Sequence, residues 1–318
     1  MLRHRFLFGL AMTVALVAVL VIDAGLDRLD VVNAPGNAPP GAPLTVPPGA
    51  VLLALFCTLV VLGGRELARL FETRGMACDR GMVMLAGVSG CVMMWLLPSM
   101  PGGVAGAVIA TLAVVLLFAT MLRHNWLRRQ SEGAMANAAV TMFALIYIGV
   151  LPGFFLTLRN DHSVWLLASI IAITKACDIG AYFTGRAVGS HKLIRWLSPG
   201  KTWEGLVGGV IASALAAVAL AAIGAAAGFT GHWSEQGTGQ FVSQQYPLVP
   251  AAIGGAVIGL IGQFGDLTAS LLKRDAEVKD SGRSIPGFGG VLDVLDSPIV
   301  VAPLAYWMIT LAGRSLAG

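Results

Sequence analysis

Apolar runs long enough to cross a membrane recur along almost the whole chain. A transmembrane helix needs roughly 17 to 25 mostly apolar residues. Runs of this kind occupy residues 6–22, 49–64, 81–98, 103–122, 134–158, 163–184, 206–228, 247–272 and 297–313. The pattern therefore predicts about nine transmembrane helices. The first run follows Arg3 and Arg5, as in a signal peptide, but no A-x-A cleavage site follows it, so we predict a retained helix.

The charges between the runs indicate how the helices are oriented. Most of the 21 Lys and Arg residues lie at the N-terminus and in the loops after the second, fourth, sixth and eighth runs. Cytoplasmic loops are typically rich in Lys and Arg, so we predict a cytoplasmic N-terminus and a C-terminus on the opposite side. The loops 23–48 and 229–246 are rich in Pro, Gly, Ser or Gln and are expected to be irregular external connections.

The composition supports a membrane protein and excludes several other classes. Hydrophobic residues make up 56% of the chain, charged residues only 12%, and the mean hydropathy is +0.79. A soluble domain carries about 25% charged residues. The pI near 9.0 follows from the basic loops and does not indicate nucleic-acid binding. The 4 cysteines and 5 histidines show no zinc spacing. The predicted fold class is an all-α, polytopic integral membrane protein.

One segment near the C-terminus, residues 262–298, concentrates the charged side chains. They are Asp266, Lys273, Arg274, Lys279, Asp280, Arg283, Asp293 and Asp296. Cytoplasmic topology explains the cations but not the three carboxylates Asp266, Asp293 and Asp296. Asp266 lies inside a predicted span, where a charge costs about 2.5–3.5 kcal/mol. Carboxylate oxygens are ligands for Mg²⁺, so the three predict a metal site. The alternative for Asp293 and Asp296 is a favourable interaction with the N-terminal end of the last helix.

Two upstream motifs and a glycine-rich turn add polar chemistry. Lys175 and Asp178 lie three residues apart in one span, so they either pair with each other or Asp178 lines a polar cavity. In the segment 198–205, Thr202 is expected to cap the next helix, which leaves Lys201 at the membrane face. The turn 286–290 precedes the last helix and could bind an anion.

The absence of several catalytic motifs narrows the reaction class. The chain has no Ser–His–Asp pattern, P-loop or Rossmann fingerprint. Metal-binding carboxylates and phosphate-binding cations without a nucleophilic side chain favour phosphoryl or nucleotidyl transfer, because a substrate phosphate can be the nucleophile.

These motifs resemble those of the CDP-diacylglycerol synthases (phosphatidate cytidylyltransferases). The family signature runs S-x-x-K-R-x4-K-D, P-G-H-G-G and D-R-x-D. This chain has Ser270, Lys273, Arg274, Lys279, Asp280, Pro286, Gly287, Gly289, Gly290, Asp293 and Asp296 in those places, and the motifs around Asp178 and Lys201 also match. The similarity covers about 160–313. Two positions depart: Phe288 replaces the family His and Val294 the family Arg, which would alter rate or substrate choice if those residues handle protons or substrate.

The resemblance implies a reaction in which CTP and phosphatidate give CDP-diacylglycerol and pyrophosphate with Mg²⁺, and a second metal ion could assist. It implies catalytic roles for Asp266, Lys273, Asp293 and Asp296, with the three aspartates as metal ligands. The expected substrate-binding residues are Ser270, Arg274, Lys279, Asp280, Lys201, Arg186 and Asp178.

The expected organisation follows from the same motifs. Residues 1–160 would form N-terminal transmembrane helices, and 161–318 a catalytic transmembrane region with cytoplasmic loops at 185–205 and 273–296. We expect a bacterial inner-membrane enzyme whose active site faces the cytoplasm and whose partners are CTP, phosphatidate and membrane lipids, but not nucleic acid. A homodimer is compatible with these expectations.

Three other interpretations stay open. The chain could be a CTP-dependent kinase or transferase that acts on another membrane lipid, to which Phe288 and Val294 would be adaptations. It could be an ion or solute transporter, although no internal repeat of the kind common in transporters is visible. It could also be a non-catalytic relative.

Overall fold

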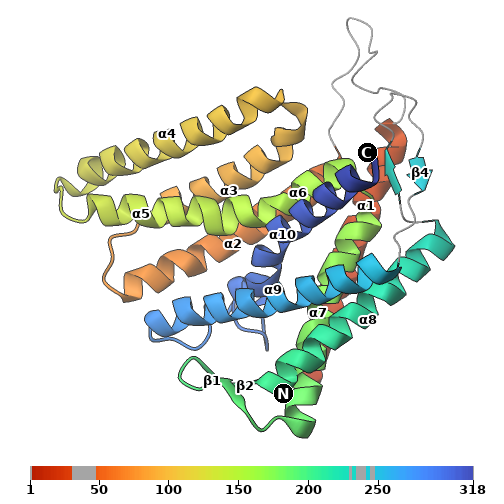
Figure 1. Ribbon diagram of the computed structural model, residues 1–318. Coiled ribbons are helices and arrows are strands. Elements are labelled where there is room, and N and C mark those ends of the chain that lie inside the picture. Colours follow the sequence, from red (N-terminus) through yellow and green to blue (C-terminus); the bar gives the residue numbers. More distant parts are fainter. Residues whose placement is uncertain (1, 31–47, 229–230, 234–240, 244–247, 318) are drawn as a thin grey trace, which may run out of the picture. The chain divides into compact units, whose positions relative to one another are not determined.

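The structure is a computed structural model that describes residues 2–30, 48–228, 231–233, 241–243 and 248–317 (Figure 1). The helices are α1 (Leu2–Asp30), α2 (Ala50–Thr73), α3 (Arg80–Leu96), η1 (Leu97–Ser99), α4 (Gly102–Arg128), α5 (Ala134–Ala144), η2 (Leu145–Val150), α6 (Leu151–Asp161), α7 (Val164–Val188), α8 (Trp203–Ala227), α9 (Leu248–Asp275) and α10 (Val291–Ala317). The strands are β1 (Lys192–Ile194), β2 (Ser198–Thr202), β3 (Gly231–Trp233) and β4 (Phe241–Ser243). They form two antiparallel pairs, β1–β2 and β3–β4.

The described residues contain 9 helical segments long and apolar enough to cross a membrane. Each overlaps one of the runs predicted from the sequence, so the all-α, polytopic fold class is confirmed. The largest difference is at the second span, which ends at Thr73 rather than near residue 64, and the last span begins at Val291 rather than near residue 297. Asp293 and Asp296 therefore lie on the first turns of α10. The sequence prediction started this helix too late because the two charges interrupt the apolar run. Residues 31–47 of the predicted loop 23–48 and most of the predicted loop 229–246 lie outside the described residues. Residues 23–30 were predicted to be irregular, but they continue α1.

The chain forms two compact units that are discontinuous in sequence. The sequence motifs predict instead a single division near residue 160. Unit 1 consists of Met1–Gly9, Leu53–Thr157 and Asp266–Pro303, and unit 2 of Leu10–Leu52, Leu158–Gly265 and Leu304–Gly318. The helices α1, α2, α6, α9 and α10 each contribute to both.

Unit 1 is built around the packed helices α3, α4 and α5 and the π-helical segment η2. Met82, Ala86, Leu116 and Leu145 form a buried apolar cluster between them. A Cβ on Gly149 in η2 would stand 2.8 Å from the carbonyl oxygen of Gly87 on α3, so glycine allows these two segments to approach closely. The turn of π-helix joins α5 to α6 without ending the membrane span, which runs from Ala134 to Asp161.

Unit 2 centres on the long contact between α7 and α8. Small residues bring the helices together: a Cβ on Gly209 would stand 2.8 Å from the carbonyl oxygen of Cys177. Thr202 caps α8, as predicted, by accepting a 3.1 Å hydrogen bond from the Gly205 amide. A buried ion pair also belongs to this unit: Arg159 Nε lies 2.7 Å from Asp23 Oδ2.

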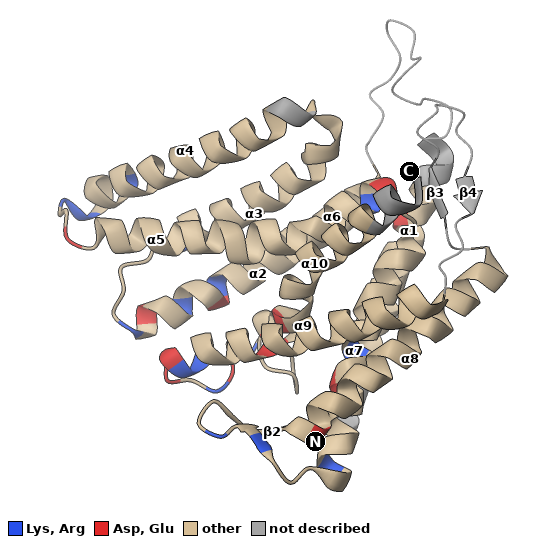
Figure 2. Ribbon diagram, viewed as in Figure 1, with Lys and Arg blue, Asp and Glu red and all other residues tan. Residues whose placement is uncertain are grey.

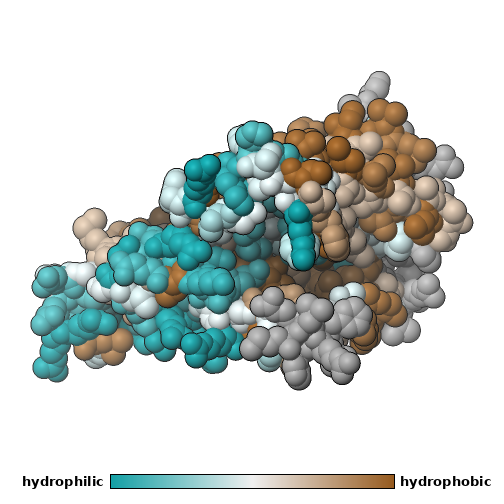
Figure 3. All heavy atoms as spheres, turned by 90° about the horizontal axis from the view of Figure 1, so that it is seen from below, coloured by the Kyte–Doolittle hydropathy of each residue, from teal (hydrophilic) through white to brown (hydrophobic). Residues whose placement is uncertain are grey.

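The surface divides into charged and apolar areas. Figure 2 shows charged residues at the C-terminal ends of α2, α4 and α9 in unit 1 and around the β1–β2 hairpin in unit 2. Figure 3 shows hydrophilic residues gathered in patches beside broad hydrophobic areas. Large apolar side chains such as Phe118 on α4 (58% exposed) and Leu215 on α8 (66% exposed) fit a surface that faces lipid.

Candidate active site

The glycine-rich loop between α9 and α10 folds into a tight turn in unit 1. Ile285 and Gly289 exchange backbone hydrogen bonds of 2.8 and 3.1 Å. Gly287 and Gly289 have φ angles of 86° and 99°, which residues other than glycine rarely adopt. The turn brings the end of the loop back toward its beginning, so that Ser281 and Gly290 face the same carboxylate.

That carboxylate is Asp293, the third residue of α10. Its Oδ1 accepts a 2.7 Å hydrogen bond from Lys273 Nζ on α9. Its Oδ2 accepts from the Gly290 amide at 2.8 Å and from the amide and hydroxyl of Ser281 at 2.9 and 3.0 Å. The bond to Gly290 is the backward half of a capping box, so Asp293 holds the helix start, the loop and the lysine together.

Glu66 on α2 is a second buried carboxylate at the same helix start. It is only 6% exposed. Its oxygens accept hydrogen bonds of 3.0 Å from both the Val291 and Leu292 amides. They also accept from the hydroxyls of Ser281 at 3.0 Å and Ser284 at 2.6 Å. From the sequence, this helix start could bind an external anion or interact with Asp293 and Asp296. In the structure its amides donate to the protein's own carboxylates, Asp293 and Glu66.

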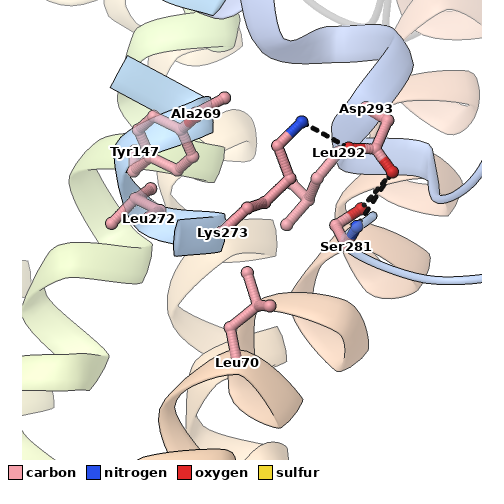
Figure 4. Close-up of a pocket in the computed structure, with 8 residues that line it drawn as sticks. All are labelled: Leu70, Tyr147, Ala269, Leu272, Lys273, Ser281, Leu292 and Asp293. Carbon is pink, nitrogen blue, oxygen red and sulfur yellow. Dashed lines mark hydrogen bonds and ion pairs between the residues drawn. The ribbon is translucent and has the colours of Figure 1, made fainter. Parts of the chain in front are cut away.

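A small pocket lies between these residues and η2 (Figure 4). It is lined by Leu70, Tyr147, Ala269, Leu272, Lys273, Ser281, Leu292 and Asp293. Figure 4 shows the Lys273 ammonium directed at Asp293, with Ser281 on the other side of the carboxylate. The pocket thus combines an apolar wall with one buried ion pair, an arrangement that excludes water from charged groups.

The three carboxylates predicted to bind metal lie in one region of unit 1. Asp266, Asp293 and Asp296 are all within electrostatic range of the Tyr147 hydroxyl. Their oxygens are of the kind that Mg²⁺ prefers. In the described residues, however, no three His, Cys, Asp or Glu side chains are close enough to enclose one ion. A shared ion would therefore require side-chain rearrangement, in which Asp293 exchanges at least one of its donors.

The remaining signature residues of unit 1 lie on α9 and the loop after it. Ser270 is half-buried on α9, one turn from both Asp266 and Lys273. Arg274, Lys279 and Asp280 are exposed. The exposed side chains are accessible to a soluble ligand, and their proposed roles in substrate binding stay predictions.

The other three predicted substrate-binding residues, Asp178, Lys201 and Arg186, belong to unit 2. Asp178 pairs with Lys175 at 3.2 Å, as one of the two sequence interpretations predicts. Asp178 also accepts a 3.1 Å hydrogen bond from the side-chain amide of Gln263. Lys201 Nζ donates to the backbone carbonyl of Gln263 at 3.3 Å, so Gln263 links Lys201 to Asp178. Arg186 is exposed and donates to the Tyr182 hydroxyl at 2.9 Å.

Sequence reasoning missed Glu66 and Tyr147. Glu66 follows Arg65 in a stretch that reads as the basic end of a span, and only its burial sets it apart. Glu66 lies just beyond the predicted run 49–64, so it did not stand out as a charge inside a span. Tyr147 stands in an apolar run where an aromatic residue is ordinary packing, and the π-helical turn that places it at the pocket leaves no clear sequence signature.

The two departures from the signature differ in their surroundings. Phe288 is 43% exposed at the tip of the loop, and its ring lies against Gly9 of α1, where an added Cβ would stand 3.2 Å from it. Val294 is half-buried on α10, next to Asp293.

The fold and the site define an integral membrane protein with buried carboxylates and a buried lysine at the ends of its helices. Residues 42–312 match the model of the cytidylyltransferase family. The chain belongs to this family, which confirms the resemblance seen in the signature motifs and makes it an enzyme of the nucleotidyltransferase class.

Curated relatives cover most of the chain. It is 33% identical over 282 residues to the phosphatidate cytidylyltransferase of Bacillus subtilis (strain 168). The alignment covers 83% of this chain and 96% of that protein. It is 29% identical over 286 residues to the phosphatidate cytidylyltransferase of Synechocystis sp., with coverage of 81% and 88%. The phosphatidate cytidylyltransferase of Mycobacterium leprae is 25% identical over 272 residues.

Proposed function

We propose that this protein is a phosphatidate cytidylyltransferase, which converts CTP and phosphatidate into CDP-diacylglycerol and pyrophosphate. The observation that carries the proposal is the buried Lys273–Asp293 pair in a chain of the cytidylyltransferase family. The pair joins the end of α9 to the start of α10, and the exposed cations Arg274 and Lys279 lie on the same helix and the loop after it.

The reaction needs no nucleophilic side chain. A phosphate oxygen of phosphatidate attacks the α-phosphorus of CTP, and the bond from that phosphorus to the oxygen shared with the β-phosphorus breaks. Pyrophosphate leaves with the bonding electrons. The protein's task is to position two anions and to offset their repulsion. Lys273, Arg274 and Lys279 supply the positive charge for the nucleotide phosphates.

In unit 1, Asp266, Ser270 and Asp280 accompany the cations. In unit 2, Asp178, Arg186 and Lys201 are candidate residues for binding a substrate phosphate, as the family motifs imply. The exposed apolar faces of the helices give acyl chains a surface of matching polarity.

We further propose that the enzyme depends on Mg²⁺, with Asp266, Asp293 and Asp296 as ligands. The support is their oxygen chemistry and the match of the family's signature motifs around them. When bound, the ion would neutralise phosphate charge and polarise the α-phosphate. A second ion would act in the same way.

The orientation of the protein follows from the distribution of Lys and Arg. The loops with most of the cations would face the cytoplasm, together with the N-terminus and the active site. CTP is a soluble nucleotide, so a cytoplasmic site in the bacterial inner membrane would give it access. Cysteine labelling of intact cells tests this orientation: Arg283→Cys should stay unlabelled by an impermeant maleimide until the membrane is opened.

A substrate comparison tests the activity. Detergent-purified protein is given CTP and Mg²⁺ with phosphatidate, lysophosphatidate, an isoprenyl phosphate or diacylglycerol, and the lipids are identified by mass spectrometry. CDP-diacylglycerol from phosphatidate is the expected product. Nucleotide addition only to another lipid phosphate would replace the proposed substrate, and no liponucleotide from any of them would contradict the proposal.

A further inference from the structure

The buried Glu66 carboxylate has a role that its place on α2 does not explain by itself. It lies far from the signature in sequence, yet its four hydrogen-bond donors all come from residues 281–292. We infer that Glu66 is a positioning residue for the active site, which holds the glycine-rich loop and, through Ser281, the carboxylate of Asp293. This inference rests on the proposed function for its catalytic consequence.

The contacts of Glu66 extend from the middle of the loop to the following helix. Ser281 and Ser284 lie in the middle of the loop, and Val291 and Leu292 open α10. Unpaired amides at a helix start favour a negative charge, so a carboxylate fits there better than a neutral side chain. Glu66 therefore holds the middle of the loop and the start of α10 against α2.

The fit around Glu66 is too close for larger residues in the loop. A Cβ on Gly290 would overlap both Glu66 Oε2 and Ser281 Oγ, and one on Gly282 would stand 2.5 Å from Glu66 Oε1. The two glycines thus allow the backbone to approach the carboxylate. This contact gives a reason for glycine at Gly290 that does not involve a nucleotide phosphate.

Ser281 links Glu66 to the site. Its hydroxyl oxygen lies 3.0 Å from Glu66 Oε2 and 3.0 Å from Asp293 Oδ2. A hydroxyl has one proton to donate, so the two carboxylates share or compete for it. A change at Glu66 therefore alters the hydrogen bonding of Asp293, and through Asp293 the position of its partner Lys273. Leu292, whose amide Glu66 accepts, also lines the pocket.

The test compares Glu66→Gln with Glu72→Gln in the purified, detergent-solubilised enzyme. Glu72 is on the same helix but is partly exposed and pairs with Arg80 outside the loop. The glutamine at position 66 keeps the shape but turns a donor toward backbone N–H groups. We expect kcat to fall by about 10–100-fold, the usual effect of losing a partner that orients an active-site ligand. Glu72→Gln should stay within about twofold, as expected for an exposed pair.

Two further readouts separate positioning from folding. The exposed Arg283 makes the loop a trypsin site, and Glu66→Gln should speed cleavage at Arg283 while the rest of the protein stays resistant. Glu66→Asp restores the charge, so it should recover part of the lost kcat and part of the resistance to trypsin. Ser281→Ala should lower kcat, and its combination with Glu66→Gln should cost less than the two effects added.

The outcomes are distinguishable. Unchanged kcat and unchanged cleavage in Glu66→Gln would overturn the inference, and strict additivity with Ser281→Ala would overturn the link through Ser281. If the wild-type protein makes no liponucleotide, the proposed function fails, while the cleavage comparison still decides whether Glu66 holds the loop.

Discussion

Lys273 Nζ on α9 lies 2.7 Å from Asp293 Oδ1 on α10, and both side chains are largely buried, with 13% and 9% exposed. A pair of this kind is costly to break from one side, because the remaining charge is left in a medium of low polarity. The pair also fixes the end of one helix against the start of the next. Lys273 and Asp293 are therefore coupled both in structure and in the proposed chemistry.

Replacement of Asp293 by asparagine tests this coupling. Asp293→Asn removes the ion pair and the proposed metal ligand, and we expect kcat/KM to fall by at least about 100-fold, as for other electrostatic groups of active sites. Asp275→Asn is the control. Asp275 is an exposed acid at the end of α9, the helix that carries Lys273, and it pairs with Arg74 at 3.6 Å. Equal activity of the two variants would remove Asp293 from the mechanism.

The metal requirement can be measured without relying on any one aspartate. Activity should disappear with EDTA and return with Mg²⁺. Asp266→Asn and Asp296→Asn should raise the Mg²⁺ concentration for half-maximal activity by about 10–100-fold or abolish activity, because each removes an oxygen ligand. A Mg²⁺ response identical to that of the wild type in both variants would show that other residues bind the ion.

Restoration of the two departing signature positions tests their part in catalysis. Phe288→His should be tolerated by the fold, because the side chain is 43% exposed. We expect the pair Phe288→His and Val294→Arg to raise kcat/KM for phosphatidate, because the changes restore the proton-carrying His and the cationic Arg of the family signature. Each single variant is measured beside the pair. An unchanged kcat/KM with every lipid phosphate would mean that the two positions have no bearing on the reaction.

The ion pair between Asp23 and Arg159 should matter for stability alone. Both residues are 1% exposed, and Asp23 also accepts from the Val51 and Leu52 amides. Arg159→Met leaves that carboxylate buried without its cation, and we expect a loss of about 3–5 kcal/mol. Unfolding in mixed micelles measures the loss.

Arg80→Gln provides the comparison for that loss. Arg80 pairs with Glu72 at an exposed position, where an ion pair contributes about 0–1 kcal/mol. Similar losses in the two variants would contradict the structural role of Arg159, and a large change in KM for CTP in Arg159→Met would contradict its separation from catalysis.

Hydrophobic length and charge placement predicted the nine spans, because each follows from local composition. The α10 start was misplaced, since the sequence shows charges at Asp293 and Asp296 but not the buried partners that allow a helix to contain them. The pairing of Lys175 with Asp178 was one of two interpretations left open by the sequence, and it was accessible because the two residues are close in sequence. Glu66 was missed because its donors lie more than 200 residues away, and only the tertiary structure brings them together.

The position of the isotope in labelled CTP gives the most direct test of the proposed reaction. The purified enzyme is incubated with phosphatidate, Mg²⁺ and CTP labelled at either the α- or the γ-phosphate. A cytidylyltransferase places the α-label in CDP-diacylglycerol and the γ-label in pyrophosphate, and this is the expected result. Transfer of the γ-label to lipid would indicate a CTP-dependent kinase, and lipid without label in both reactions would contradict catalysis of nucleotidyl transfer.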